Sequence, residues 1–296
     1  MTSASVVLPA YRSDRTIGGC LAALRRQTVP PAEVIVVNSS PGDRTRSIVT
    51  GSFPEVVYVE SGERLLPHAA RNLGASRASG DVVVFTDPDC EAAPDWIERL
   101  LGAHAAGHEL VVGSMGAAGR GRLERGVHLV KFWWLLPGLA PGRRWIAPTA
   151  NAAYSRRMWE AAGPFEGSRF ASDGVTSWHA SRLAGQEPWF EPRARVNHRH
   201  AGGVGALWRE RVGRGEEFGA IRMDWERWSR ARAAAHALAY PALPALVLVR
   251  SARAARRAGW LRDWLVTLPT QAVGQLGWST GELRAHVRRV MGGDAA

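Results

Sequence analysis

The sequence predicts an α/β protein built on a doubly wound mixed sheet, followed by a helical region of different composition. Two observations predict it. Short runs of β-branched and apolar residues alternate with segments whose apolar residues recur at helical spacing. This alternation favours strands joined by crossover helices. From about Trp228 the chain becomes rich in arginine and tryptophan around short apolar stretches, which indicates a separate helical part.

Four strands are expected before residue 90, at residues 5–11, 33–37, 56–59 and 82–86. The intervening helices are expected around residues 17–24, in a short segment after residue 43, and around residues 69–75. Because crossovers between parallel strands are right-handed, the loops that follow the strands collect at one edge of the sheet. We therefore expect five polar side chains to converge there: Tyr11, Asn38, Asp43, Asp87 and Asp89.

The fourth strand ends on two carboxylates, Asp87 and Asp89, which are separated by the stiff residue Pro88. Carboxylate oxygens suit hard cations such as Mg²⁺ or Mn²⁺, which keep several waters and bridge to substrate phosphates. The same three residues also fit a simple turn at the end of a strand. Their position at the carboxyl end of a buried strand favours the metal site.

Net charge, cysteine count and missing motifs indicate which partners and compartments fit this chain. In 296 residues, 38 basic side chains oppose 27 acidic ones, and the net charge of +11 favours an anionic partner. Cys20 and Cys90 are too few for a disulfide framework, so we expect a reducing compartment. We expect neither a signal peptide nor a membrane-spanning helix. There is no G-x-G-x-x-G after the first strand and no P-loop motif, which disfavours dinucleotide and P-loop sites.

Four segments resemble, in order and spacing, the successive blocks of family 2 glycosyltransferases with the GT-A fold. They are residues 6–11, 36–43, 70–74 and 85–89. The resemblance covers about residues 3–215. It implies an inverting transfer of a sugar from a nucleotide-sugar donor, assisted by Mg²⁺ or Mn²⁺.

The resemblance also implies roles for single residues on the donor side. Donor-site roles fall on Pro9, Ala10, Tyr11, Asn38, Asp43, Arg71 and Asp87. Asp89 would bind the metal directly, while Asp87 would contact the ribose and the metal's shell. Asn38 stands where the family often has an Asp that accepts a hydrogen bond from uracil; an amide carbonyl can accept the same bond. UDP is therefore the leading nucleotide, with GDP and dTDP still open.

Each of two donor-site residues has a simpler reading as well. Asp43 could cap a helix, and Arg71 could lie on a solvated helix face. The same holds for His198, which resembles a third metal ligand of some GT-A enzymes but also fits polar surface.

Residues 172–179 resemble the family block Glu-Asp-x-x-x-Ser-Trp-Arg, although Ser172 replaces the Glu and His179 the Arg. Asp173 falls on the block's Asp, the usual catalytic base, which takes the proton of the attacking acceptor hydroxyl. Its simpler reading is a helix cap. The resemblance places Asn151 and Trp178 on the acceptor side.

The expected division is a catalytic domain over residues 1–228 and a helical region over residues 229–296. Basic flanks, short apolar runs and Trp260, Trp264 and Trp278 suit helices that lie in a membrane interface. The alternative is a tail packed on the protein itself. We expect a cytoplasmic protein, peripheral at the inner face of the cell membrane, that takes a glycan or lipid-linked acceptor in cell-envelope synthesis.

Three other functions stay open on the sequence alone. They are a nucleotidyltransferase, a degenerate transferase that binds donor without transferring, and a basic membrane-associated binding protein. No nucleic-acid recognition motif is present, so we expect no nucleic-acid partner.

Overall fold

The computed structural model describes residues 2–40 and 42–292. Pro41 of the second sequence block and the last four residues of the expected tail lie outside these ranges. The chain forms two compact units. Unit 1 comprises Met1–Ala118 and Ala140–Arg199, and unit 2 comprises Gly119–Leu139 and His200–Ala296. The boundary expected at residues 228 and 229 falls inside unit 2.

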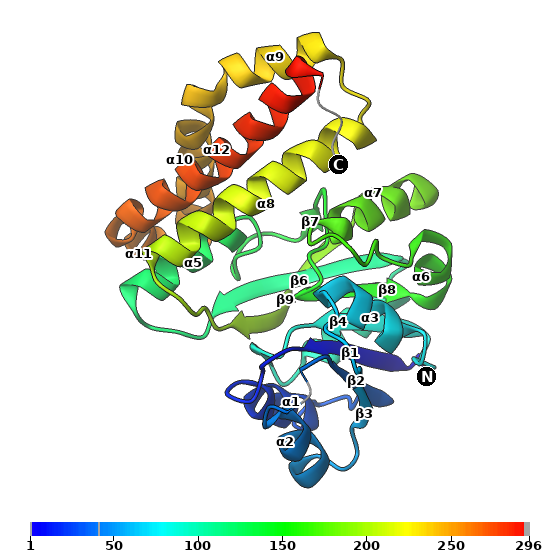
Figure 1. Ribbon diagram of the computed structural model, residues 1–296. Coiled ribbons are helices and arrows are strands. Elements are labelled where there is room, and N and C mark those ends of the chain that lie inside the picture. The colour runs from blue at the N-terminus through cyan, green and yellow to red at the C-terminus, as the bar shows by residue number, and fades with distance from the viewer. Residues whose placement is uncertain (1, 41, 293–296) are drawn as a thin grey trace. The chain divides into compact units, whose positions relative to one another are not determined.

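Within the described residues, unit 1 is built on a nine-stranded mixed sheet in the order β3-β2-β1-β4-β8-β6-β9-β5, with β7 paired to β9 (Figure 1). Strands β3, β2, β1 and β4 are parallel, and β8 is antiparallel to both β4 and β6. The strands are β1 Ala4–Ala10, β2 Glu33–Asn38, β3 Val57–Glu60, β4 Val82–Thr86, β5 Cys90–Ala92, β6 Leu110–Ala117, β7 Gly142–Arg143, β8 Asn151–Ser155 and β9 Trp189–His198.

The register of the sheet brings several chain segments to one edge. Ala10, the last residue of β1, lies opposite Asn38, the last residue of β2. Thr86 at the end of β4 lies opposite Asn151, where the antiparallel strand β8 begins. The loops after β1, β2 and β4 and the loop before β8 therefore meet at the same edge, as the parallel part of the sheet requires.

Helices of unit 1 cover the sheet. They are α1 Ile17–Arg25, α2 Thr45–Ser52, α3 Pro67–Ala75, α4 Trp96–Ala105, α6 Arg156–Ala162 and α7 Ser172–Ala184. Every residue of β4 is buried, which explains its run of β-branched side chains. Helix α3 packs close to β1 through Gly74, because a Cβ there would lie 2.4 Å from the Cγ1 of Val7. This close approach sets the position of α3 beside the sheet.

Unit 2 is helical. Its elements are α5 Arg122–Phe132, α8 Val204–Trp225, α9 Arg230–Leu238, the 3₁₀ turn η1 Tyr240–Ala242, α10 Leu243–Arg257, α11 Leu261–Val266 and α12 Leu268–Met291. Helices α8 and α12 lie side by side (Figure 1). Glycines allow their backbones to touch: a Cβ at Gly215 would lie 2.2 Å from Trp278 O, and one at Gly281 would lie 2.1 Å from Val212 O.

The tryptophans of the tail make contacts inside unit 2. The indole of Trp260 stacks on His128, Trp264 donates its Nε1–H to Ser251 Oγ at 2.9 Å, and Trp278 packs against Phe218. Among the described residues, no single helix is long and apolar enough to cross a membrane. Helix α9 and the segment Tyr240–Arg257, bent by 49° at their junction, satisfy the same length and composition test only together.

Candidate active site

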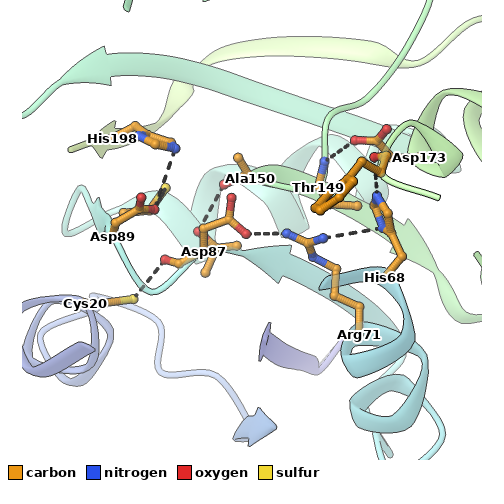
Figure 2. A network of polar contacts seen from close by, with 12 residues as sticks. Cys20, His68, Arg71, Asp87, Asp89, Thr149, Ala150, Asp173 and His198 are labelled. Carbon is orange, nitrogen blue, oxygen red and sulfur yellow. Dashed lines mark hydrogen bonds and ion pairs between the residues drawn. The ribbon is translucent and has the colours of Figure 1, made fainter. Parts of the chain in front are cut away.

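The first carboxylate after β4 is held by a buried arginine. Asp87 directly follows β4, and its side chain is 23% exposed. Its Oδ1 accepts a hydrogen bond from Nη2 of Arg71 on α3, and the two side chains form an ion pair (Figure 2). Arg71 is almost fully buried, so the solvated-face alternative does not apply. Its Nε–H has no hydrogen-bond partner among the described residues, which leaves a buried cationic donor group at this edge.

His68 continues this network on α3, one helical turn before Arg71. Its Nδ1 lies 3.4 Å from Arg71 Nη1, and its Nε2 lies 2.8 Å from the carbonyl oxygen of Phe170. Burial, and next the charge of Arg71, lower the pKa of His68 to about 4. The imidazole is therefore neutral near pH 7, accepts from Arg71 at Nδ1, and donates at Nε2 to the segment that leads into α7.

Asp173 lies in the first turn of α7 and is tied to the start of β8. Its Oδ1 accepts from the backbone N–H of Gly174 at 2.9 Å, and its Oδ2 accepts from Thr149 N–H at 3.3 Å (Figure 2). The next residue, Ala150, accepts at its carbonyl a 3.0 Å hydrogen bond from Thr86 Oγ1, at the end of β4. Two hydrogen bonds, made by the neighbouring residues Thr149 and Ala150, therefore connect the candidate base to β4, the strand that precedes Asp87 and Asp89.

Asp89 lies beside His198 and Cys90. One ligand atom from each of these three residues lies within 4.8 Å of the others, and His198 Nε2 is 3.6 Å from Asp89 Oδ1. Strand pairing causes this grouping, because β5 places Cys90 opposite His198 of β9. The sequence groups Asp87, Asp89 and His198 as metal ligands; the structure brings Asp89 and His198 together but adds Cys90, while Asp87 is paired with Arg71.

The chemistry of these donors suits a divalent cation. A carboxylate oxygen and an imidazole nitrogen lie together at the sheet edge, and both can ligate a first-row divalent ion. Cys90 is fully buried, and burial, together with the nearby charges of Asp89 and Asp87, raises the pKa of its thiol. The thiol is consequently protonated, so the oxygen and nitrogen donors are the better ligands for Mg²⁺ or Mn²⁺.

The expected nucleotide side contains one accessible aromatic side chain. Tyr11 follows β1, and the guanidinium groups of Arg64 and Arg12 lie 4.7 Å and 5.3 Å from the centre of its ring. The ring is 37% exposed. Pro9 and Ala10 are buried within β1, and the Ala10 carbonyl accepts a hydrogen bond from Ser39 N–H, so the strand itself is covered at that point.

Asn38 and Asp43 are already engaged in the loop after β2. The fully buried Asn38 donates from Nδ2 to the Tyr58 hydroxyl, and its Oδ1 accepts from the backbone and hydroxyl of Ser40. Asp43 accepts hydrogen bonds from the backbone and hydroxyl of Thr45, the first residue of α2, and its Oδ2 competes with Asn38 Oδ1 for the single hydroxyl proton of Ser40. This geometry is the helix-capping alternative for Asp43. Ser40 also contacts the Asn38 carbonyl oxygen through its backbone N–H and its hydroxyl, so a hydrogen bond from uracil would have to compete with Ser40.

Asn151 is a structural residue in this arrangement. It is fully buried, accepts from Trp96 Nε1, and donates from Nδ2 to the carbonyls of Ser114 and Ala194, all at 2.9 Å. An acceptor could reach the Asn151 amide only if the sheet rearranged, so the acceptor contact expected from the resemblance stays a prediction that needs such a rearrangement. Trp178, by contrast, lies half-buried on α7 and stacks on Trp145.

Sequence reasoning overlooked His68 and Cys90 at this site, and it gave Trp145 no role of its own within a segment that resembles the family's acceptor side. His68 had a usable signal, because it lies three residues before Arg71 and therefore on the same helix face. Cys90 is adjacent to Asp89 in the sequence, but its approach to His198 depends on strand register. Trp145 stands in a loop between β7 and β8, where periodicity gives no information.

Comparison with known proteins agrees with this geometry. Residues 5–159, more than half of the chain, match the family described as Glycosyl transferase family 2. The chain is 27% identical to glycosyltransferase AglE of Haloferax volcanii over 59% of each protein. It is 32% identical to an undecaprenyl-phosphate 4-deoxy-4-formamido-L-arabinose transferase of Pectobacterium carotovorum, over 36% of this chain and 35% of that protein. The matches thus span less than two thirds of these relatives.

A solved structure shares the fold across nearly the whole chain. The mannosyltransferase PcManGT from Pyrobaculum calidifontis, in complex with GDP-Man and Mn²⁺, superposes with a TM-score of 0.62 at 22% identity. The match covers 98% of this chain and 87% of that one. It confirms the GT-A fold with a helical C-terminal region that the sequence predicts. With the family match over more than half of its length, the chain belongs to glycosyl transferase family 2.

Proposed function

We propose that this protein transfers a sugar from a nucleotide-sugar donor to an acceptor hydroxyl, with inversion at the anomeric carbon and with a divalent cation. One observation carries the proposal. Three carboxylates meet at a single sheet edge: Asp87 and Asp89 at the end of β4, and Asp173 on the helix tied to the start of β8. Such an edge is where α/β folds bind ligands, and here it combines metal-ligand and base chemistry.

Asp89 and His198 are the residues that would hold the cation, with Asp87 adjacent in the chain. When bound, Mg²⁺ or Mn²⁺ would neutralise negative charge on the donor diphosphate. Support comes from the O and N donors gathered at this edge and from the Mn²⁺ in the PcManGT complex. Arg71 adds a fixed, buried cation beside Asp87, and its positive charge favours an anionic donor at this edge.

Asp173 would act as the general base. The acceptor O–H proton passes to its carboxylate while the acceptor oxygen forms a bond to the anomeric carbon. The bond from that carbon to the diphosphate oxygen breaks, and the nucleoside diphosphate leaves with the electron pair. Two backbone N–H groups hold the Asp173 carboxylate in place, and the neutral His68 adds no competing positive charge beside it.

The acceptor belongs to cell-envelope chemistry in this proposal, either a glycan or a lipid-linked molecule. The undecaprenyl-phosphate transferase among the relatives supports it. The whole chemistry of that enzyme does not transfer to this chain, because the match covers about a third of its length.

We propose a peripheral location at the cytoplasmic side of the membrane, and an exposed apolar and basic surface on unit 2 supports contact with a bilayer. Helix α10 exposes Leu246 and Val249 together with Arg250 and Arg253 along one stripe. Leu265 of α11 is 57% exposed. The ion pairs of unit 2 among the described residues use other arginines, namely Arg125, Arg232, Arg288 and Arg289. Exposed apolar side chains beside unpaired arginines suit the surface of an anionic bilayer.

The test is a transfer assay with a panel of UDP-, GDP- and dTDP-sugars and membrane-extracted acceptors. Asp173→Asn should keep nucleotide binding and lose about 10²- to 10⁴-fold in transfer rate, the usual contribution of a general base. Asp81→Asn is the matched control, because Asp81 precedes β4 at its opposite end and its carboxylate accepts hydrogen bonds from Ser3, away from the site. Transfer by Asp173→Asn at the wild-type rate would exclude Asp173 as the base.

A further inference from the structure

Two tryptophans lie on the segments that position the candidate base, α7 and the loop before β8. Trp145, in the loop before β8, and Trp178, on α7, have ring centroids 6.4 Å apart and planes inclined by 27°. Trp145 is 43% exposed. A third aromatic residue, Phe170, is 37% exposed and precedes Asp173 by three residues. Single exposed aromatic residues are common on protein surfaces, but a stacked pair next to a candidate catalytic carboxylate is a feature of binding sites.

The backbone that carries Trp145 is fixed on both sides. Before it, Arg144 N–H donates to Pro188 O at 2.9 Å, and the Arg144 guanidinium lies 4.1 Å from the centre of the Phe190 ring. After it, Ala147 N–H donates to Ser177 Oγ at 3.0 Å. Trp145 is therefore exposed on an anchored loop, and a ligand would not have to order that loop on binding.

Helix α7 carries Trp178 and Asp173, and it is bonded to the loop that carries Trp145. Ser177 and Asp173 are one turn apart on α7, and their side chains accept hydrogen bonds from Ala147 and Thr149 of the loop that carries Trp145. Trp178 follows Asp173 by five residues, about 7.5 Å along the helix axis.

We infer that Trp145 and Trp178 form a stacking platform for a pyranose ring of a saccharide acceptor. The inference rests on the proposed function and names its acceptor class. One face of a pyranose presents C–H groups, which pack on the electron-rich face of an indole, while its hydroxyls remain free for polar contacts. A ring held on the platform would present a hydroxyl towards Asp173.

The position of the platform distinguishes a sugar from the other occupants of the site. Tyr11, the accessible aromatic residue of the nucleotide side, follows β1, whereas Trp145 precedes β8, on the other side of β4 in the sheet. A nucleobase on Tyr11 would therefore leave the tryptophan pair for the acceptor. The pair also lies on the segments that hold Asp173, the group that would receive the proton of a sugar hydroxyl. A phosphate acceptor is largely ionised near pH 7 and needs no base.

The test uses an array of defined mono- and disaccharides, with undecaprenyl phosphate in detergent as a separate probe, in the presence of UDP or GDP and Mn²⁺. Wild-type protein should bind at least one arrayed saccharide. Trp145→Ala should weaken that binding, and raise KM for the same saccharide in transfer, by about tenfold. Trp145→Phe should retain most of the wild-type affinity for the saccharide, because a flat aromatic ring remains. The control is Val57→Ala, an exposed apolar residue on β3 at the far edge of the sheet.

Three results would overturn the inference. The first is unchanged saccharide affinity in Trp145→Ala, and the second is use of undecaprenyl phosphate as acceptor with equal efficiency by wild type and Trp145→Ala. The third is failure of the wild type to bind any arrayed saccharide while it still binds nucleotide. Absence of nucleotide binding would instead contradict the proposed function itself, so the two failures are distinguishable.

Discussion

Replacing Asn151 by alanine tests whether this residue is structural or a contact for the acceptor. The pairing of β6 with β9 shifts register between Gly113 and Ser114, which leaves an irregular stretch in β9. Asn151 bridges that irregularity, because its Nδ2 donates to both Ser114 O and Ala194 O while its Oδ1 accepts from Trp96 Nε1. Gly113 makes room for the amide, since a Cβ there would lie 2.3 Å from Asn151 Nδ2.

The expected cost follows from these three hydrogen bonds. Each contributes about 1 kcal/mol, and a buried donor or acceptor left without a partner costs about 1–3 kcal/mol. Because the lost bonds share one side chain, we expect Asn151→Ala to lower the free energy of unfolding by about 3–5 kcal/mol. Urea unfolding followed by circular dichroism measures the change. Thr50→Ala, which removes an exposed hydroxyl bonded within α2, is the control and should cost less than about 1 kcal/mol.

A different outcome would identify Asn151 as an acceptor contact. If Asn151→Ala unfolds within about 1 kcal/mol of wild type but raises KM for the acceptor, the amide does not hold the sheet together. The structural explanation would then be refuted.

Three further predictions concern the rest of the molecule. Because the pKa of His68 is about 4 in the folded protein against a usual 6.5, its contribution to stability is fully present above pH 6.5 and is lost as the pH falls towards 4. Urea unfolding at pH 7 and pH 4.5 should show a difference of up to about 3 kcal/mol that shrinks in His68→Gln. Arg71→Met should raise the pKa of His68, measured by NMR titration, because the Arg71 charge lowers it; an unchanged pKa would mean that burial alone sets it. Gly281→Ala should destabilise unit 2, because its new Cβ would meet Val212 O, whereas Gly213→Ala, with open space around it, should leave the melting temperature unchanged or raise it; equal melting temperatures would contradict the close packing of α8 and α12.

The sequence was sufficient for the part of the fold that depends on local pattern. Buried strands show as β-branched runs, and the alternation with helices sets their parallel order, so the meeting of Tyr11, Asn38 and Asp87 at one edge could be anticipated. Asp173 could be placed only with the family resemblance, because on spacing alone a carboxylate in the first turn of a helix reads as a cap.

The remainder depends on contacts between distant segments. Cys90 approaches His198 because β5 pairs with β9, and Asp87 turns to Arg71 because α3 packs against β1; neither follows from a single stretch of chain. Asn151 looked like part of an acceptor segment, but a buried amide that fills an irregularity in the sheet has the same local sequence signature. The positions of the tryptophans in the sequence likewise do not reveal that they pack against other residues of unit 2.

The central claim is that Asp89 and its neighbours form a metal-dependent nucleotide site. The most direct measurement is calorimetric titration of UDP, GDP and dTDP, with and without Mn²⁺, into wild type, Asp89→Ala and the control Asp81→Ala. We expect one nucleotide to bind wild type and Asp81→Ala with a strong dependence on Mn²⁺, and to lose that dependence in Asp89→Ala. Equal, metal-independent binding by all three proteins, or no binding to folded wild type, would contradict the claim.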